Sequence, residues 1–391
     1  MKKIFFICFT PFQLISSIYY ASKIGDIKKY QRILIWINYY DYRIESKMIA
    51  SFFEKIIEIP YYDNVNKIKK QFLKFYYMGY AFKCNPIGKE MKNIDSTTII
   101  LCFSEVNETT HRAIEIVAKK GGKIILVEEG MGTYFSHNYK ESKKTFLIRM
   151  ILGMHTEKCI GSFSAISKVF LQHPEWNKKF KKELVIQQNN IFKDRMFLEQ
   201  LHFVKDKVKF INSEFKKSIL WLGDPVEEIG GKKSEELSLI RSISLKLAGN
   251  YQIFIKPHPR EDIHVYDEIL GNNIKLLVIK DIEWIPAEII SSYLDFNTII
   301  TSASSAAINI YELKRNCQII YVYKLIEGIF EISEKALKPI LSRQNVWVPD
   351  SEFQIIDLIK KEGDLKPVNL VVKQLDLDIK YLREVMVKDN E

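Results

Sequence analysis

The segment KPHPR (256–260) places His258 between two prolines, directly after an apolar stretch. Because each proline fixes its own φ angle and restricts the residue before it, the backbone around this histidine is stiff. An imidazole titrates near neutrality, so one held at a strand end can hydrogen-bond a phosphate or protonate a leaving phosphate oxygen. A surface turn with structural prolines explains the same residues equally well.

Ser304 and Ser305 follow the apolar stretch 296–302 and precede a helical pattern with small residues in its first turn. The amides at a helix N-terminus, together with two hydroxyls, can converge on an anion such as a phosphate. Serine is also a common N-cap residue, and an N-cap alone implies no ligand.

Two acidic turns provide candidate general bases. Glu128 and Glu129 follow the apolar stretch 123–127 and precede Gly130. Adjacent carboxylates at a crowded strand end repel each other, which raises one pKa and suits a general base. The alternative is an acidic turn at the surface, which is the commoner location of a Glu-Glu-Gly sequence.

The second acidic turn, WLGDPVEE (221–228), follows another apolar stretch. One of Asp224, Glu227 and Glu228 could there remove the proton from an acceptor hydroxyl. The alternative is a polar turn in which an acidic residue stabilises the start of the next helix.

The remaining histidines and the cysteines carry less information. Six histidines have no polar partner at a telling spacing, and we interpret them as structural or surface residues: His111, His137, His155, His173, His202 and His264. No Asp-x-Asp motif follows a predicted strand, so neither a metal nor another cofactor is predicted. The five scattered cysteines favour reduced thiols in the cytoplasm over disulfides or zinc.

The composition predicts a folded protein of two domains. The chain has 391 residues, of which 47% are hydrophobic, and this length exceeds what one hydrophobic core usually organises. With 58 Lys and Arg against 48 Asp and Glu, the net charge is +10. A basic protein attracts nucleic acid, acidic lipid or anionic small substrates. No nucleic-acid-binding motif is recognisable, which disfavours the first of these.

The N-terminus predicts a buried strand at 3–9 and a helix that begins at Pro11. Two lysines before an apolar run imitate a signal peptide, but the run ends after six residues, so a cleaved signal is the less favoured interpretation. The stretch is too short to span a bilayer, and no other segment approaches a transmembrane helix.

Strand-like and helix-like segments alternate along both halves of the chain, which predicts two parallel α/β domains. We expect ligands in a cleft between them, at the carboxyl ends of the strands. The predicted domains are 1–210 and 211–391, with a boundary near 205–217 and a C-terminal helix over 378–387. The predicted strands are 3–9, 32–37, 98–103, 123–127, 274–279, 296–302 and 317–323, with two more within the segments SILWLGDP (218–225) and QIFIKPHP (252–259). The predicted helices are 11–23, one after 32–37 that runs through residue 55, 66–83, 109–119, 234–248, 285–294 and one from 304, with a helical, lysine-rich section at about 164–217.

Five short motifs occur in the order found in bacterial sialyltransferases of glycosyltransferase families 52 and 38, which the chain resembles over most of its length. The motifs are FICFTPFQ (6–13), VEEGMGTY (127–134), LGDP (222–225), KPHPRE (256–261) and SASSAA (302–307). These families make lipooligosaccharide and capsular polysialic acid. The resemblance implies a GT-B fold of two Rossmann-like domains, an N-terminal one on the acceptor side and a C-terminal one that binds the nucleotide sugar.

The resemblance also implies a metal-independent, inverting transfer of sialic acid from CMP-sialic acid to a sugar hydroxyl, with a galactose-terminated glycan as the expected acceptor. His258 would contact the CMP phosphate and act as the acid, while Ser304 and Ser305 would hold the same phosphate. Other residues expected at the donor are Gln13, Gly130, Gly223, Lys256, Pro259 and Arg260. The likeness further leaves room for a homodimer and for peripheral association with the cytoplasmic membrane.

The two families imply different bases. In the polysialic acid branch the acidic-acidic-Gly motif supplies the base, which corresponds here to Glu128 and Glu129. In the lipooligosaccharide branch an aspartate follows a Gly-x-Pro turn, but Val226 occupies that position here, with Asp224 and Glu227 close by. We favour Glu129, then Glu227.

Two other functions remain open from the sequence. Enzymes that transfer glycerol phosphate or ribitol phosphate from a CDP donor also release CMP and share the His-Pro and Ser-Ser features. A non-enzymatic module that binds sugars or nucleotides is the second alternative. Replacement of His258 by alanine distinguishes a binding module from an enzyme, because only an enzyme would lose turnover.

Overall fold

The computed structural model describes residues 2–24, 30–38, 44, 46–59, 76, 85–105, 108–134, 160–208, 218–271, 273–279, 282–294, 296–314, 317–361 and 376–388. The chain divides into two compact units. Unit 1 comprises Met1–Ile191 and Gln374–Glu391, and unit 2 comprises Phe192–Lys373. The division expected from the sequence differs from this one in two places, because 192–210 cluster with unit 2 and the C-terminal helix clusters with unit 1.

Unit 1 contains a parallel sheet with the strand order β3-β2-β1-β4-β5-β6-β7. The first strands extend the sheet in one direction from β1, and β4 then starts on its other side, which is the order of a Rossmann fold. The strands are β1 (Lys2–Cys8), β2 (Tyr30–Ile37), β3 (Lys55–Ile59), β4 (Ile99–Cys102), β5 (Lys123–Val127), β6 (Ile166–Leu171) and β7 (Val185–Gln187).

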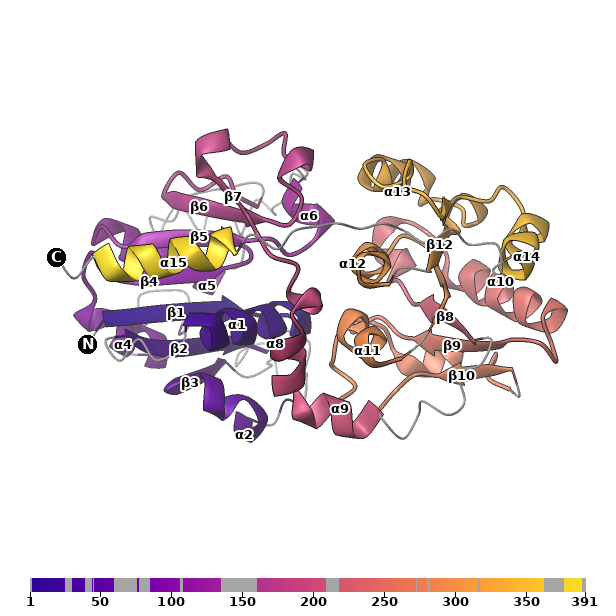
Figure 1. Ribbon diagram of the computed structural model, residues 1–391, viewed down its shortest axis with the longest axis horizontal. Coiled ribbons are helices and arrows are strands. Elements are labelled where there is room, and N and C mark those ends of the chain that lie inside the picture. Colours follow the sequence, from indigo (N-terminus) through magenta and orange to yellow (C-terminus); the bar gives the residue numbers. More distant parts are fainter. Residues whose placement is uncertain are drawn as a thin grey trace. The chain divides into compact units, whose positions relative to one another are not determined.

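The helices of unit 1 cover this sheet (Figure 1). They are α1 (Pro11–Ile24), α2 (Ser46–Ile49), α4 (Pro86–Glu90), α5 (Glu108–Lys119), α6 (Met131–Tyr134) and α15 (Leu377–Lys388). As predicted, α1 begins at Pro11. The start of α1 has reciprocal capping hydrogen bonds, as in a capping box. The hydroxyl of Thr10 accepts from the amide of Gln13, and the Gln13 side chain accepts from the amide of Phe9.

The C-terminal helix α15 is fastened to unit 1 by a buried carboxylate. Asp378 is fully buried and accepts hydrogen bonds from the hydroxyl of Tyr20 at 2.8 Å and from the amide of Asn189 at 3.1 Å. The helix packs on α1 and reaches β7 (Figure 1). One face of α15 is therefore part of the core of unit 1.

Unit 2 repeats the same topology with six parallel strands in the order β10-β9-β8-β11-β12-β13. The point where the strand order reverses lies between β8 and β11, and open α/β sheets bind their ligands there, outside the carboxyl ends of the strands. The strands are β8 (Ser218–Leu222), β9 (Gln252–Lys256), β10 (Ile274–Leu276), β11 (Thr298–Thr301), β12 (Gln318–Tyr321) and β13 (Val346–Trp347).

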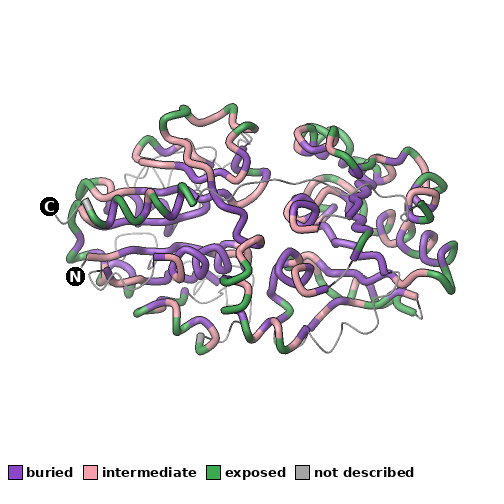
Figure 2. The backbone as a smooth tube through the Cα atoms, in the orientation of Figure 1, coloured by how far each residue is buried: buried purple, intermediate pink, exposed green. Residues whose placement is uncertain are grey.

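The central strands of both sheets are buried along nearly their whole length, while the outer sides of the helices are exposed (Figure 2). Strands β8, β11 and β12 consist entirely of buried residues, as expected for parallel strands covered on both faces. The helices of unit 2 are α8 (Arg195–Gln200), α9 (His202–Val208), α10 (Lys233–Lys246), α11 (Ala287–Tyr293), α12 (Ala306–Leu313), α13 (Phe330–Leu337) and α14 (Glu352–Lys360).

The predicted class, two α/β domains with parallel sheets, is confirmed. Four strands were missed: the prediction of a helix through residue 55 is wrong at β3, the prediction of a helical section at 164–217 is wrong at β6 and β7, and no strand was predicted at β13. These strands lie toward the edges of their sheets, where burial on one side only weakens the apolar signal. The predicted helix at 66–83 lies, apart from Tyr76, outside the described residues.

Candidate active site

Asp224 joins two neighbouring strand ends at the switch point of unit 2. It follows β8, and its Oδ2 accepts hydrogen bonds from the hydroxyl of Thr301 at 2.7 Å and from the amide of Ala303 at 2.8 Å, both at the end of β11. Burial raises the pKa of Asp224 to about 6, although these two bonds oppose the shift. A carboxylate used in this way fixes the loop that carries the serines.

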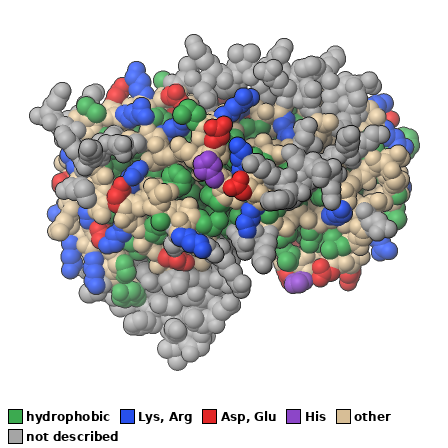
Figure 3. Space-filling view, turned by 60° about the horizontal axis from the view of Figure 1, so that its bottom comes forward, with side chains coloured by type: hydrophobic (Ala, Val, Ile, Leu, Met, Phe, Trp, Pro, Cys, Tyr) green, Lys and Arg blue, Asp and Glu red, His purple; other side chains and the backbone are tan. Residues whose placement is uncertain are grey.

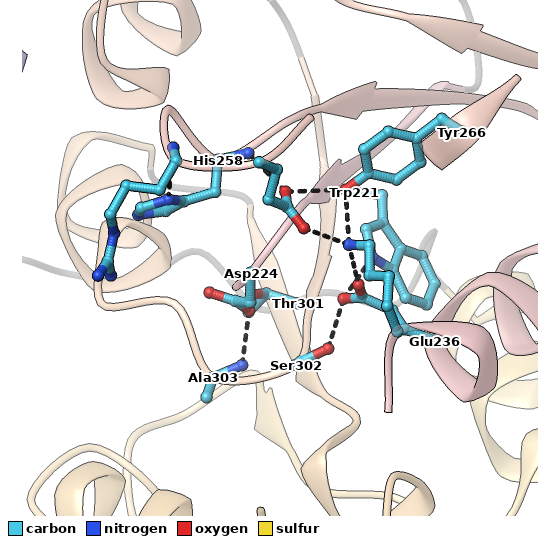
Figure 4. A network of polar contacts seen from close by, with 11 residues as sticks. Trp221, Asp224, Glu236, His258, Tyr266, Thr301, Ser302 and Ala303 are labelled. Carbon is cyan, nitrogen blue, oxygen red and sulfur yellow. Dashed lines mark hydrogen bonds and ion pairs between the residues drawn. The ribbon is translucent and has the colours of Figure 1, made fainter. Parts of the chain in front are cut away.

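His258 lies at the end of β9, the neighbour of β8 on the other side. Figure 4 shows its imidazole together with the side chains of Asp224 and Ser302 at the carboxyl ends of the strands. Adjacent strands lie about 4.8 Å apart, so the ends of β9, β8 and β11 span roughly 10 Å. That span is comparable to the size of a nucleotide phosphate with its attached sugar.

A hydrogen bond to the His258 ring fixes its tautomer. Nδ1 accepts a hydrogen bond from the amide of Arg260 at 3.1 Å, so the proton of the neutral ring resides on Nε2. Burial, with the charges of Arg260, Lys256 and Lys233, lowers the pKa of His258 to about 3. Without ligand, the site thus contains a neutral imidazole that presents an Nε2–H donor.

Ser304 and Ser305 precede helix α12 and are half-buried. The hydroxyl of Ser304 accepts a long hydrogen bond from the amide of Ala306 at 3.4 Å, whereas the side chain of Ser305 does not cap the helix. Among the described residues, the amides of Ser305 and Ala307 have no hydrogen-bond acceptor. Two amides and a hydroxyl at a helix N-terminus are suited to an anion.

The cations beside His258 have other partners. Lys256 is buried and donates to the carbonyl of Glu283 at 2.9 Å, and its burial lowers its pKa to about 8. Arg260 forms an ion pair with Glu228. Pro259, between the two, is exposed. The two cations contribute positive potential, in line with the charges that lower the pKa of His258.

A buried network beneath the imidazole was not predicted from the sequence. Glu261 accepts from the amide of His258 at 2.8 Å and pairs with Lys233 of α10, which also pairs with the fully buried Glu236. Glu236 in turn accepts from the hydroxyl of Ser302 at 2.6 Å (Figure 4). The His-x-x-Glu spacing, typical of a side chain that caps a turn, is the signal that could have identified Glu261.

Gly223, an expected donor-binding residue, lies against this network. A Cβ atom at this position would approach Glu261 Oε2 and the hydroxyl of Tyr266 to 2.4 Å each and the amide of His258 to 3.2 Å. The position therefore requires glycine for the close approach of the β8 end to the turn of His258.

Glu128 and Glu129 lie at the end of β5 in unit 1. Glu128 is buried, and its Oε2 accepts hydrogen bonds from the hydroxyl of Tyr134 and from the amide of Gln172, the latter at 2.6 Å. Glu129 is half-buried, and its amide donates to the hydroxyl of Thr133 at 3.1 Å. The carboxylate of Glu128 is thus held by hydrogen bonds within the protein, whereas Glu129 is more accessible to solvent.

The chain matches the family model of alpha-2,8-polysialyltransferases (POLYST) over residues 4–323. The chain belongs to this family. Polysialyltransferases are glycosyltransferases, so membership confirms the polysialyltransferase side of the resemblance, whereas the assignment to family 52 stays a prediction. The comparison with curated proteins gives no match.

Solved structures show that this family member has the GT-B fold. A candidate UDP-N-acetylglucosamine 2-epimerase from Listeria monocytogenes aligns with a TM-score of 0.61 at 12% identity, covering 100% of this chain and 97% of the other. The 2-epimerase of Neisseria meningitidis bound to UDP-GlcNAc gives 0.54 at 13%, covering 99% and 100%. The wall teichoic acid polymerase TagF (H548A) gives 0.51 at 10%, covering 99% and 89%. At these identities the likeness concerns the fold alone.

Two expected site residues of this polysialyltransferase family member have structural roles. Gln13 lies in unit 1, where its Oε1 caps α1 as described above. Gly130 has a φ of 131°, which a residue with a side chain rarely adopts, and its carbonyl starts α6 by accepting from Thr133. Glu227 is exposed in the 3₁₀ turn Val226–Ile229 of unit 2, where the neighbouring Glu228 contacts Arg260.

The described part of this polysialyltransferase relative contains no group of three or more His, Cys, Asp or Glu side chains that could bind a metal ion. Within the same residues, no helix has the length and apolarity needed to cross a bilayer. On the face drawn in Figure 3, the described lysine and arginine side chains alternate with acidic ones and do not merge into one basic patch.

Proposed function

We propose that the chain is a metal-independent, inverting sialyltransferase that moves sialic acid from CMP-sialic acid to a sugar hydroxyl. The observation that carries the proposal is the neutral Nε2–H of His258 at the end of β9, on one side of β8, while β11, which leads to Ser304 and Ser305, lies on the other side of β8. Family membership supports sialic acid as the transferred sugar.

In this reaction the bond between sialic acid and the CMP phosphate breaks, and negative charge accumulates on the departing phosphate oxygen. The amides of Ser305 and Ala307, the two serine hydroxyls and the positive end of α12 would stabilise this charge. His258 would add a hydrogen bond from Nε2–H. Donors fixed in place before the reaction are more effective than water, which must reorient.

His258 acts in this proposal as a neutral hydrogen-bond donor, which modifies the role of acid expected from the resemblance. A second proton on the ring would have to bind Nδ1, where the amide of Arg260 already donates. In an imidazolium, the N–H group at Nδ1 would therefore point at the N–H group of Arg260. The loss of hydration of the charged ring would be a further cost. The CMP leaving group needs no protonation if its charge is stabilised in this way.

The acceptor hydroxyl must lose its proton as it attacks. We propose Glu129 as the base, because the Oε2 atom of Glu128 already accepts two hydrogen bonds while Glu129 is more accessible. Glu128 would then hold the turn. For the acceptor, the family name favours a glycan that ends in sialic acid over the galactose-terminated glycan expected from the sequence.

The test is incubation of the chain with CMP-sialic acid and each of the two acceptors, with and without EDTA. Release of CMP and a product heavier by one or more sialic acid residues are expected, unchanged by EDTA. Parallel incubations with CDP-glycerol and CDP-ribitol test the alternative of phosphate-group transfer. Turnover of a CDP donor with none of CMP-sialic acid would overturn the proposal.

A further inference from the structure

Glu261 holds both backbone polar groups of His258. Its Oε2 accepts from the amide of His258 at 2.8 Å, and its own amide donates to the carbonyl of His258 at 2.9 Å. These two bonds close the turn that also brings the amide of Arg260 onto Nδ1 of the imidazole. The orientation of the ring therefore depends on a side chain three residues away.

Glu261 is itself fixed by two further groups. Its Oε1 pairs with the ammonium of Lys233, and its Oε2 accepts from the hydroxyl of Tyr266 at 2.9 Å. Lys233 also donates to Tyr266 at 2.8 Å and pairs with Glu236. All three N–H groups of the ammonium are thus engaged within the network, so Lys233 is not available to a phosphate.

The network continues to the loop of the serines. Glu236 accepts from the hydroxyl of Ser302 at 2.6 Å and, at 3.4 Å, from the indole of Trp221 in β8. A continuous set of contacts thus runs from the backbone of His258 through Glu261, Lys233 and Glu236 to Ser302. It connects the strand end that carries the imidazole with the loop that carries the hydroxyls.

From these contacts we infer that Glu261 is a positioning residue, which with Lys233 fixes the turn and tautomer of His258 relative to the serine loop. The inference rests on the proposed function. Buried ion pairs are often no more stable than apolar packing, so two carboxylates paired with one ammonium are better explained by geometry than by stability. Glycine at 223 leaves the space that this network occupies.

The test combines nitrogen NMR of the histidine-labelled 391-residue chain with kinetics. The signal of His258, assigned by its loss in His258→Ala, is expected to show the Nε2–H tautomer. In Glu261→Ala we expect exchange between both tautomers and a fall in kcat of about tenfold or more, with a smaller change in KM. Glu261→Gln retains an acceptor for the amide of His258 and should recover part of kcat.

A double-mutant cycle decides whether Glu261 acts through the imidazole. Glu261→Ala is expected to have little further effect on kcat in a chain that already carries His258→Ala. The matched control is Glu312→Gln, which removes another buried carboxylate of unit 2, paired with Arg343 at 2.7 Å; it should lower stability and leave the tautomer and kcat unchanged.

Additive losses in the cycle, or an unchanged tautomer in Glu261→Ala, would overturn the inference. The NMR measurement needs no turnover. If the wild-type chain does not transfer sialic acid, the proposed function fails while the tautomer and its dependence on Glu261 still decide the positioning role.

Discussion

The Nδ1 atom of His258 accepts a hydrogen bond from the amide of Arg260, at a distance of 3.1 Å. The imidazole is thereby hydrogen-bonded to the turn that carries it. Nε2 is the ring nitrogen that remains for contact with a ligand. Because Nδ1 has one lone pair, this bond and a proton on the same atom exclude each other. The charge state of the imidazole is thus coupled to the conformation of the turn.

The pH dependence of kcat/KM distinguishes a neutral His258 from a protonated one. The pKa of about 3 means that the imidazole is neutral at every pH between 5 and 8 in the free protein. If the neutral form is active, kcat/KM shows no decline from this residue in that range. If the imidazolium were required, kcat/KM would fall tenfold for each unit of pH above 3.

An inflection near pH 6 has another source, the carboxyl of Asp224, whose pKa is about 6. Its ionisation repels an anionic donor. We therefore expect such an inflection to disappear in Asp224→Asn, which makes that variant the control for the pH profile.

Loss of the His258 side chain should impair turnover and spare the fold. For His258→Ala we expect kcat to fall about 10²- to 10³-fold, as for the removal of one donor from an oxyanion site. The matched control is His264→Ala, whose imidazole is exposed and pairs with Asp267 at 3.1 Å. Steady-state kinetics and circular dichroism of both variants provide the check, and equal losses in the two would contradict the role of His258.

Ser305 is expected to bind the donor phosphate. Its hydroxyl does not cap α12, so Ser305→Ala removes a ligand contact without weakening the helix. A hydrogen bond to a charged group contributes about 1.5 to 3 kcal/mol, which predicts an increase of about 10- to 100-fold in the Kd for CMP by calorimetry. Ser292→Ala, which removes a hydroxyl bonded to the carbonyl of Glu288, should leave Kd unchanged.

Substitution of Glu129 and substitution of Glu128 should affect different properties of the protein. Glu129→Gln is expected to lower kcat by about 10²-fold or more and to leave the affinity for CMP unchanged, because a base acts on the acceptor. Glu128→Gln should mainly lower the melting temperature, since the Oε2 of Glu128 accepts from Tyr134 and Gln172. The opposite pattern would assign the base to Glu128.

Asp224 should make unit 2 less stable as the pH rises. Its folded pKa of about 6 exceeds the unfolded value of about 4, so the folded state binds more protons between these values, and stability is lost as pH increases through them. Asp224→Asn retains an acceptor oxygen and removes this loss. Relative to wild type, the variant should gain about 1 to 2 kcal/mol between pH 5 and 8.

Urea unfolding of both proteins at the two pH values measures this gain. Asp357→Asn, at a half-buried aspartate that pairs with Lys361, provides the comparison and should change by less than about 0.5 kcal/mol. A pH-independent difference between Asp224→Asn and wild type would show that Asp224 has an ordinary pKa.

The central strands could be predicted from the sequence because burial on both faces makes them continuously apolar. The predicted strand 123–127 coincides with β5, and the strand predicted at 98–103 contains β4. By contrast, β6 contains a lysine and a serine within six residues, and β7 has three half-buried residues. Such strands are stabilised by pairing with distant segments, which local composition does not report.

The site was predictable to the extent that its residues follow strand ends. His258, Asp224 and Ser304 lie at three neighbouring ends in unit 2, as the alternating pattern indicated. Asp224 was expected as one candidate base, which stays a prediction; that its carboxylate joins β8 to β11 was not predictable from the sequence. Lys233 and Glu236 were missed because a charged pair three residues apart on a helix usually faces water.

The attachment of the C-terminal helix to unit 1 has a consequence for biosynthesis. A ribosome completes every residue of unit 2 before it makes Asp378, the partner of Tyr20. The nascent chain therefore exposes the surface that α15 later covers until α15 itself has been made. Unit 1, although it begins first, is the last to be completed.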